Sequence, residues 1–134
     1  MTMKTHLRTG LTAVAAAAGL LLTGAPAASA TTSVSHDFFL WGADGVSYFD
    51  GVATFSNRSA NVSGTFHAVG CKRFYASAHA GSTQLDIRST STHCNATTSE
   101  NIPLKADVVG GANRIRVALT DQNGQNGTGG DIYR

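Results

Sequence analysis

Charged residues are scarce in this sequence, and neither sign dominates. Only 13% of the 134 residues are Asp, Glu, Lys or Arg. After residue 30 eight basic side chains are balanced by eight acidic ones, because Lys4 and Arg8 carry the formal excess of +2. Nucleic-acid affinity comes mostly from neutralising phosphates, and binding to an anionic membrane needs a comparable positive excess. The balance therefore argues against both kinds of partner for the chain after residue 30.

Closely spaced metal ligands are also missing. The four histidines after residue 30 show no short spacing such as H-x-x-x-H, so we expect neither a zinc site nor a cofactor; they are His36, His67, His79 and His93. A Gly- and Asn-rich segment offers oxygen ligands for calcium, with Asp121, Asn123 and Asp131 as the candidates. It fails the EF-hand pattern, because its sixth position is Asn126 and its twelfth is Ile132. We therefore favour a mobile turn over a calcium site.

The first thirty residues have the three parts of a secretory leader. Lys4 and Arg8 form a basic start, Leu11 to Leu22 is an apolar run, and Ala28-Ser29-Ala30 is a small-x-small cleavage motif. This order predicts a signal peptide cleaved after Ala30, and the apolar run is too short for a membrane span. We expect residues 31–134 to be one secreted, extracellular domain, monomeric and without membrane attachment.

Cysteine is limited to Cys71 and Cys94, and in an exported chain such a pair favours a disulfide. A hairpin centred between Ser82 and Thr83 pairs residues whose numbers sum to 165, so that Cys71 faces Cys94. Opposed residues of an antiparallel pair lie within the Cα separation that a disulfide accepts. We therefore predict a cross-strand disulfide within one sheet, with Lys72 opposite His93.

The same register sorts the hairpin side chains by polarity, because successive residues of a strand point to opposite faces. The apolar face carries Phe74, Ala76, Ala78, Ala80, Leu85 and Ile87. The polar face places His79 opposite Asp86 and Tyr75 between Arg73 and Arg88.

The remaining chain reads as short strands separated by turns, with no helical periodicity after the leader. Strands are expected at Val34–Trp41, Val62–Ala68, Ile102–Ala106, Arg114–Thr120 and Ile132–Tyr133, and Asn95–Asn101 is expected to be a loop. Asp50-Gly51 is a typical tight-turn pair, which predicts a hairpin of Val46–Phe49 with Val52–Phe55. The pattern predicts an all-β fold, an antiparallel β-sandwich of immunoglobulin-like shape with seven to nine strands, and a barrel is the alternative.

Ser77, His79 and Asp86 are the residue types of a nucleophile, a base and an orienting acid. A regular strand, however, offers no strained elbow and no free N–H pair to stabilise an oxyanion. We therefore interpret His79 and Asp86 as a cross-strand surface pair and expect no enzyme, with a small hydrolase as a minor alternative.

Aromatic residues are the best functional signal. Phe39 and Trp41 are out of phase with Phe38 and Leu40, so either both faces of that strand are covered or one face shows aromatic rings to solvent. Rigid aromatic and Arg side chains are typical of binding surfaces. The candidate ligand-binding residues are Trp41, Tyr48, Arg73, Tyr75 and Arg88. The sequence favours a non-catalytic binding domain for a carbohydrate or protein, and a cell-surface structural component is the alternative.

Several segments resemble small secreted proteins of high-GC Gram-positive bacteria. They are the Ala-rich leader ending at Ala30, Gly70-Cys71-Lys72-Arg73, Arg88 to Cys94, and Ala106 to Ala112. The resemblance implies secretion but no particular activity.

Overall fold

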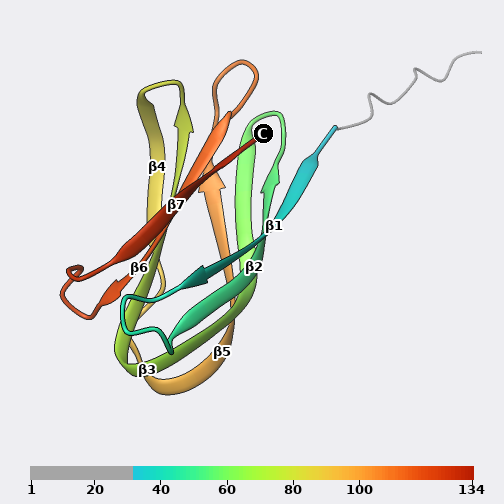
Figure 1. Cartoon of the computed structure of the whole chain (residues 1–134). Coiled ribbons are helices and arrows are strands. Elements are labelled where there is room, and N and C mark those ends of the chain that lie inside the picture. Colours follow the sequence, from blue (N-terminus) through green and yellow to red (C-terminus); the bar gives the residue numbers. More distant parts are fainter. Residues whose placement is uncertain (1–31) are drawn as a thin grey trace, which may run out of the picture. The chain divides into compact units, whose positions relative to one another are not determined.

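A computed structural model describes residues 32–134, and the predicted signal peptide lies outside these residues. The described chain forms seven strands joined by antiparallel pairing, and it contains no helix. The strands are β1 (Val34–Trp41), β2 (Tyr48–Phe55), β3 (Ser59–Ala80), β4 (Thr83–Ser89), β5 (His93–Lys105), β6 (Arg114–Asp121) and β7 (Thr128–Tyr133). Figure 1 shows one curled sheet in which the long strand β3 bends, and the other strands pair along its two edges or extend the sheet from there.

The strand β3 organises the fold because it has four partners. Its first half lies between β2 and β5, and its second half lies between β4 and β6. The two halves meet at a register shift between Ala68 and Cys71, where Gly70 has a φ of 70°. A bulge of this kind bends a strand and increases its twist. The bend turns the two halves of the sheet towards each other.

The curled sheet is nearly barrel-shaped, and side chains bridge the places where the ladder stops. The Asp86 carboxylate accepts a hydrogen bond of 2.8 Å from the Lys105 backbone N–H and so links β4 to β5. The Thr128 hydroxyl donates to the Trp41 carbonyl and links β7 to β1. The all-β class, the antiparallel pairing, the strand number and the disulfide are therefore confirmed, and the barrel alternative fits the closure.

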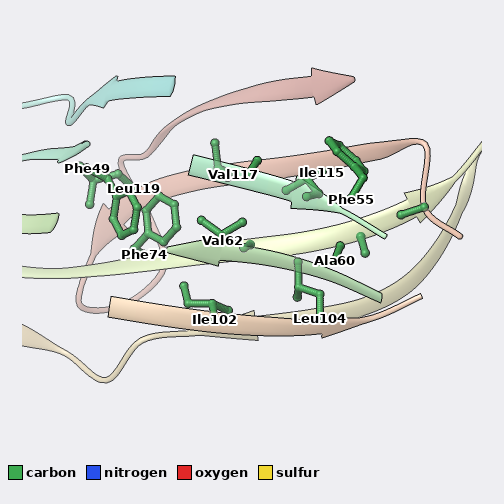
Figure 2. Close-up of a cluster of buried hydrophobic side chains, with 14 of the residues drawn as sticks. Phe49, Phe55, Ala60, Val62, Phe74, Ile102, Leu104, Ile115, Val117 and Leu119 are labelled. Atoms are coloured by element: carbon green, nitrogen blue, oxygen red, sulfur yellow. The ribbon is translucent and has the colours of Figure 1, made fainter. Parts of the chain in front are cut away.

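The core is made by aromatic and aliphatic side chains from both halves of the sheet (Figure 2). Phe49 of β2 stacks on Phe74 of β3 with ring centroids 3.8 Å apart, and both side chains are completely buried. Ile115 and Leu119 of β6 complete the packing from the other half. Burial of these side chains supplies most of the driving force for folding.

The predicted Asp50-Gly51 turn is wrong, because β2 runs straight through it. Asp50 pairs with Phe39 on one side and with Thr65 on the other, and Gly51 lies opposite Gly64. A Cβ at Gly64 would lie 2.2 Å from the Asp50 carbonyl oxygen, so the two strands approach too closely for any side chain there. Gly51 is therefore not a turn residue, and it lies where β2 and β3 approach each other closely.

The predicted register of the Cys71–Cys94 hairpin is correct at one end and wrong at the other. Cys71 pairs with Cys94 and Lys72 with His93, and the cysteine Cα atoms are 4.0 Å apart in a disulfide within one sheet. These pairs, however, join β3 to β5, because the segment between Cys71 and Cys94 contains β4 and the start of β5.

The β3–β4 ladder is shifted from the predicted register. Asp86 lies opposite Ala78, and His79 lies opposite Gln84, since Leu85 is an extra residue at a register shift. The turn is Gly81-Ser82, where Gly81 has a φ of 63° as a primed turn with a leading glycine requires. Ile87, expected on the apolar face, is consequently 52% exposed on the opposite face.

The predicted strands at Arg114–Thr120 and Ile132–Tyr133 are confirmed within slightly longer ones, and Ile102–Lys105 lies in β5. The predicted loop Asn95–Asn101 is wrong, because these residues belong to β5 and pair with β3. Alternate side chains of this segment point outward and are polar, so its composition resembles that of a loop although it is a strand.

Candidate binding surface

A row of aromatic side chains crosses β1, β2 and β3 on the outer face of the sheet, and Thr97 of β5 continues it. The pairing places Trp41 of β1 opposite Tyr48 of β2, Tyr48 opposite His67 of β3, and His67 opposite Thr97 of β5. Directly opposed residues of antiparallel strands share a face, so the four side chains lie side by side. Phe39 joins the row from the next outward position of β1. We call Phe39, Trp41, Tyr48 and His67 the aromatic platform.

The rings of the aromatic platform are in mutual contact. Phe39 stacks on Tyr48 at 5.2 Å, and Tyr48 stacks on His67 at 5.0 Å, with interplanar angles of 23° and 25°. Trp41 packs edge-on against both Phe39 and Tyr48, at 5.0 Å and 5.8 Å. Phe39 is 49% exposed and Trp41 53% exposed. Of the two expectations for β1, the one with aromatic rings open to solvent therefore holds for this face.

The outer face around the aromatic platform is polar, and the charged side chains in the two neighbouring rows are the carboxylates of Asp37 and Asp50. The next row of paired positions after the platform carries Asp50, Thr65 and Ser99, and the row beyond it carries Asp37, Val52, Ser63 and Asn101. No Lys or Arg stands in these rows. His67 Nδ1 lies 2.7 Å from the Thr97 hydroxyl oxygen, a hydrogen-bond distance that fixes the imidazole plane against Tyr48. The surface combines flat rings with hydroxyl, amide and carboxylate groups.

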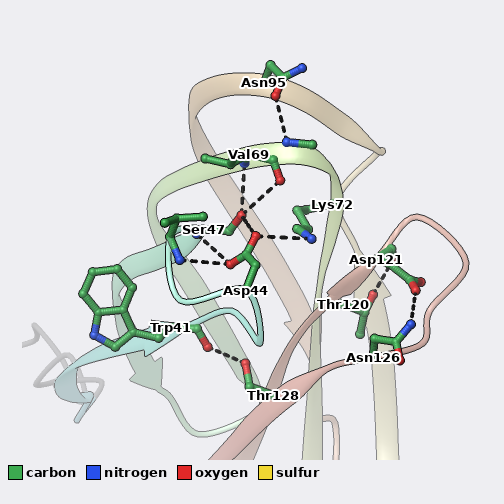
Figure 3. A network of polar contacts seen from close by, with 12 residues as sticks. Trp41, Asp44, Ser47, Val69, Lys72, Asn95, Thr120, Asp121, Asn126 and Thr128 are labelled. Atoms are coloured by element: carbon green, nitrogen blue, oxygen red, sulfur yellow. Dashed lines mark hydrogen bonds and ion pairs between the residues drawn. The ribbon is translucent and has the colours of Figure 1, made fainter.

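A polar network holds the β1–β2 turn that carries Trp41 and Tyr48 (Figure 3). The Ser47 hydroxyl, fully buried, donates to the Asp44 carboxylate at 2.7 Å and accepts from the Val69 N–H at 3.0 Å. Lys72 Nζ lies 3.3 Å from the same carboxylate. The network therefore ties the turn to the bend of β3.

The ionisation of Asp44 reflects this network. Partial burial alone would raise the pKa of the Asp44 carboxyl, but hydrogen bonds from Ser47 and Val46, together with Lys72, hold it well below its usual range. The carboxylate thus stays charged through ordinary pH and keeps the turn in place.

The other candidate ligand-binding residues lie away from the aromatic platform, on the second half of β3 and on β4. Arg73 and Tyr75 share the outer face of β3, as predicted. Arg88 lies opposite Ala76, so Arg88 and Tyr75 are on different faces of the sheet. The Arg88 Nε is 3.2 Å from Asp86 Oδ2. The predicted grouping of Tyr75 with Arg88 is therefore wrong, for the same reason as the β3–β4 register.

Of the hydrolase-type residues, Ser77 and His79 come together and Asp86 does not. Ser77 Oγ and His79 Nε2 are 2.9 Å apart, and both residues are buried on the outer side of β3. Asp86 shares the face of Ala78 and is engaged by the Lys105 N–H and by Arg88. His79 Nδ1 makes no hydrogen bond within the described residues, so no acid orients the imidazole.

The calcium candidates are engaged with donors. The Asp121 carboxylate accepts hydrogen bonds from the backbone N–H groups of Asn123 and Gln125 and from the Asn126 side chain, at 2.8–2.9 Å. Asp131 accepts from Arg116 instead. The structure thus gives the Asp121 segment the geometry of a turn closed on its own carboxylate.

Sequence reasoning found Trp41 and Tyr48 but missed the roles of His67 and Thr97. The signal for His67 is its outward phase in the predicted strand Val62–Ala68, whereas Thr97 lies in the segment that was predicted to be a loop. Both residues can be assigned to the surface only once the pairing of β2 with β3 and of β3 with β5 is known.

The described residues 32–134 supply no further clue to a chemistry. No helix in that part of the chain is long and apolar enough to cross a membrane, and no group of three or more His, Cys, Asp or Glu side chains there could hold a metal ion. Comparison with known protein families, with curated proteins and with solved structures found no match to this chain.

Proposed function

We propose that the protein is a non-catalytic extracellular binding domain whose aromatic platform takes an uncharged polysaccharide. The supporting observation is the row of contacting rings formed by Trp41, Tyr48 and His67, with Phe39 beside it. One side of a pyranose ring presents C–H groups, which pack on flat aromatic faces, while its hydroxyls need hydrogen-bonding neighbours. The half-exposed rings of Phe39 and Trp41 are available to the C–H groups, and Asp50, Thr65 and Ser99 lie beside them with hydrogen-bonding groups.

The shape and charge of the surface favour an extended neutral chain over a single sugar or an acidic one. The platform crosses three strands, β1, β2 and β3, and neighbouring strands are spaced about 4.8 Å apart, so the platform is longer than one sugar ring. The neighbouring outward rows carry the acidic residues Asp37 and Asp50 and no cation. An anionic polysaccharide would meet like charge there.

The experiment measures retention of the secreted protein on insoluble cellulose, chitin and xylan, followed by a glycan array. We expect binding to at least one neutral polysaccharide and loss of about tenfold or more in affinity for Trp41→Ala and for Tyr48→Ala. Tyr133→Ala is the matched control, because Tyr133 is an aromatic residue that is 63% exposed on β7, outside the platform. Blank results on all polysaccharides and on the array would refute a sugar ligand, and capture of a specific protein by the platform would replace it.

Secretion is part of the same proposal. It is supported by the leader-like residues 1–30 and by the Cys71–Cys94 disulfide, a bond that persists in oxidising compartments. N-terminal sequencing of protein recovered from culture fluid tests it, with Thr31 as the expected first residue. Recovery of the uncleaved chain in the cytoplasm would contradict it.

A further inference from the structure

A hollow lies on the other half of the sheet, over β4, the second half of β3, and β6. Its volume is about 530 Å³, and its lining includes Tyr75, Ser77, His79, Gln84, Ile87 and Arg116. Sites for small ligands typically have volumes of about 300–1,000 Å³ and combine apolar walls with a few polar groups. We call this place the His79 hollow; it shares no residue with the aromatic platform.

The floor of the His79 hollow is polar and uncharged. Ser77 and His79 are 5% and 7% exposed, and their side chains are within hydrogen-bond distance of each other. Burial lowers the pKa of His79, and the charges of Arg114 and Arg116 lower it further against the opposing effect of Asp131. The imidazole is therefore neutral at pH 7, and the Ser77 hydroxyl can turn towards a ligand.

The charged groups near His79 have an excess of positive charge: Arg116 lines the hollow, and Arg114 and Asp131 lie close enough to act on His79. Arg116 donates to both oxygens of Asp131, at 2.8 Å and 3.1 Å, and Arg114 Nη1 lies 3.7 Å from the same carboxylate. Two guanidinium groups thus share one anion. Arg116 has a side chain that is 56% exposed, and its Nη1 takes no part in the pair with Asp131. A guanidinium that is half exposed and has a nitrogen free of the Asp131 pair is well suited to bind a carboxylate.

We propose that the His79 hollow is a second ligand site, which binds a small polyhydroxy molecule carrying a carboxylate, of the uronic acid type. Arg116 binds the carboxylate, and Ser77 and Gln84 hydrogen-bond the hydroxyls. Tyr75 and Ile87 supply the apolar walls against which the C–H face of the sugar packs. The two sites differ in charge preference, because the aromatic platform has acidic neighbours and the His79 hollow has basic ones.

The test compares galacturonate with galactose, which differ only in the carboxylate. Both are titrated into the mature protein and followed by calorimetry and by backbone amide NMR. We expect galacturonate to bind, to shift the amide signals of Tyr75, Ser77 and His79 and not that of Trp41, and to bind more weakly as salt is raised. Equal binding of the two sugars, or no binding of galacturonate, would overturn the proposal.

Two variants and a matched control locate the site. Arg116→Gln is expected to weaken galacturonate binding about tenfold, because it removes a charge-assisted hydrogen bond. Gln84→Glu, an isosteric change at an exposed position, is expected to weaken it by repulsion even if Arg116→Gln proves unstable. Arg58→Gln is the control, since Arg58 is also exposed and paired with one carboxylate, Asp107, at 2.7 Å. Loss of binding in Arg58→Gln with Arg116→Gln unaffected would place the ligand elsewhere and refute the assignment.

The two sites are separable by experiment. Trp41→Ala is expected to leave galacturonate binding unchanged, and Arg116→Gln is expected to leave polysaccharide retention unchanged. A negative result for one of the two proposed sites therefore does not refute the other. A parallel titration with trigalacturonate identifies the source of the ligand: tighter binding than the monomer indicates a polymer residue, and equal binding indicates a free sugar acid, and both support the site.

Discussion

The two halves of β3 carry outer surfaces of different chemistry. The first half contributes His67 to the aromatic platform, which is rich in rings and has no Lys or Arg in the neighbouring rows. The second half contributes Ser77 and His79 to a hollow whose rim is basic. The alternation of side chains is the same in both halves, but the bend near Gly70 sends their outer faces in different directions. One strand can therefore contribute to two surfaces. Substitutions can distinguish effects on binding at one surface from effects on the stability that both halves share.

The largest loss of stability is expected from a substitution in the core, where side chains of the two halves pack together. Phe74 of the second half stacks on Phe49 of the first at 3.8 Å and is fully buried. Phe74→Ala should lower the free energy of unfolding by about 3–5 kcal/mol, because it leaves a cavity in the core. Urea denaturation measures the loss, and both polysaccharide retention and galacturonate binding should fall together.

Phe39→Ala is the comparison variant for Phe74→Ala. Phe39 is half exposed on the aromatic platform, so its removal should cost less than about 1 kcal/mol of stability. It should weaken polysaccharide retention and leave galacturonate binding intact. If Phe74→Ala impaired only one surface, the two halves would not share a core as the packing indicates.

The next effect is confined to the first half. In Gly64→Ala the new Cβ would lie 2.2 Å from the Asp50 carbonyl oxygen, which forces β2 away from β3. We expect a loss of about 2–3 kcal/mol in the free energy of unfolding, with hydrogen-exchange protection falling first in β1 and β2. Gly130→Ala is the control, since nothing lies within 4 Å of a Cβ at Gly130. Equal loss of protection in β6 and β7 would show that the halves do not open separately.

The sequence predicted the disulfide end of the fold better than its turn end, for a physical reason. Cys71 with Cys94 and Lys72 with His93 are pairs that the register summing to 165 contained. The pairing of His79 with Asp86 failed because Leu85 is an extra residue at a register shift in β4. The hydrophobic pattern favours the predicted register, because it places Leu85 and Ile87 on the apolar face. The observed register instead leaves Ile87 exposed and depends on an irregularity at Leu85 that the alternation of side chains does not reveal.

The aromatic platform was only half predictable for a different reason. The phase of Phe39 and Trp41 within one strand is local information, and it left open whether both faces of β1 are covered or one face exposes its rings. The contributions of His67 and Thr97 depend on pairing between strands distant in the sequence, which periodicity does not encode. Asp50-Gly51 was misread because its local turn preference is overridden by the close approach of Gly51 to Gly64.

A smaller and more local effect is expected at the turn beneath the aromatic platform. Asp44→Asn removes the charge that binds Lys72 and one acceptor for Ser47, so stability at pH 7 should fall by about 1–2 kcal/mol. Because the pKa of Asp44 is lowered in the folded state, its contribution is present above the ordinary value of 3.8 and is lost as the pH falls through the folded pKa. Polysaccharide retention should weaken, while galacturonate binding stays. Asp37→Asn, an exposed change on β1, is the control, and an equal loss in that variant would contradict a role for the network.

The smallest effect belongs to the second half, where stability also rises with pH but in a higher pH range than for Asp44. The pKa of His79 is lowered on folding by burial and by Arg114 and Arg116, against the opposing charge of Asp131, so the unfolded chain binds a proton that the folded chain refuses. Stability should therefore rise with pH as it passes from the folded pKa up to the ordinary value of 6.5, and it should be fully recovered above that value. Urea denaturation at a series of pH values measures the slope, and His79→Gln should reduce it because Gln does not titrate. A bound carboxylate in the His79 hollow should raise the pKa of His79, which histidine NMR signals report directly. If the slope were the same in His79→Gln and the His79 signals did not respond to galacturonate, the second half of β3 would carry neither a buried titrating group nor a ligand site.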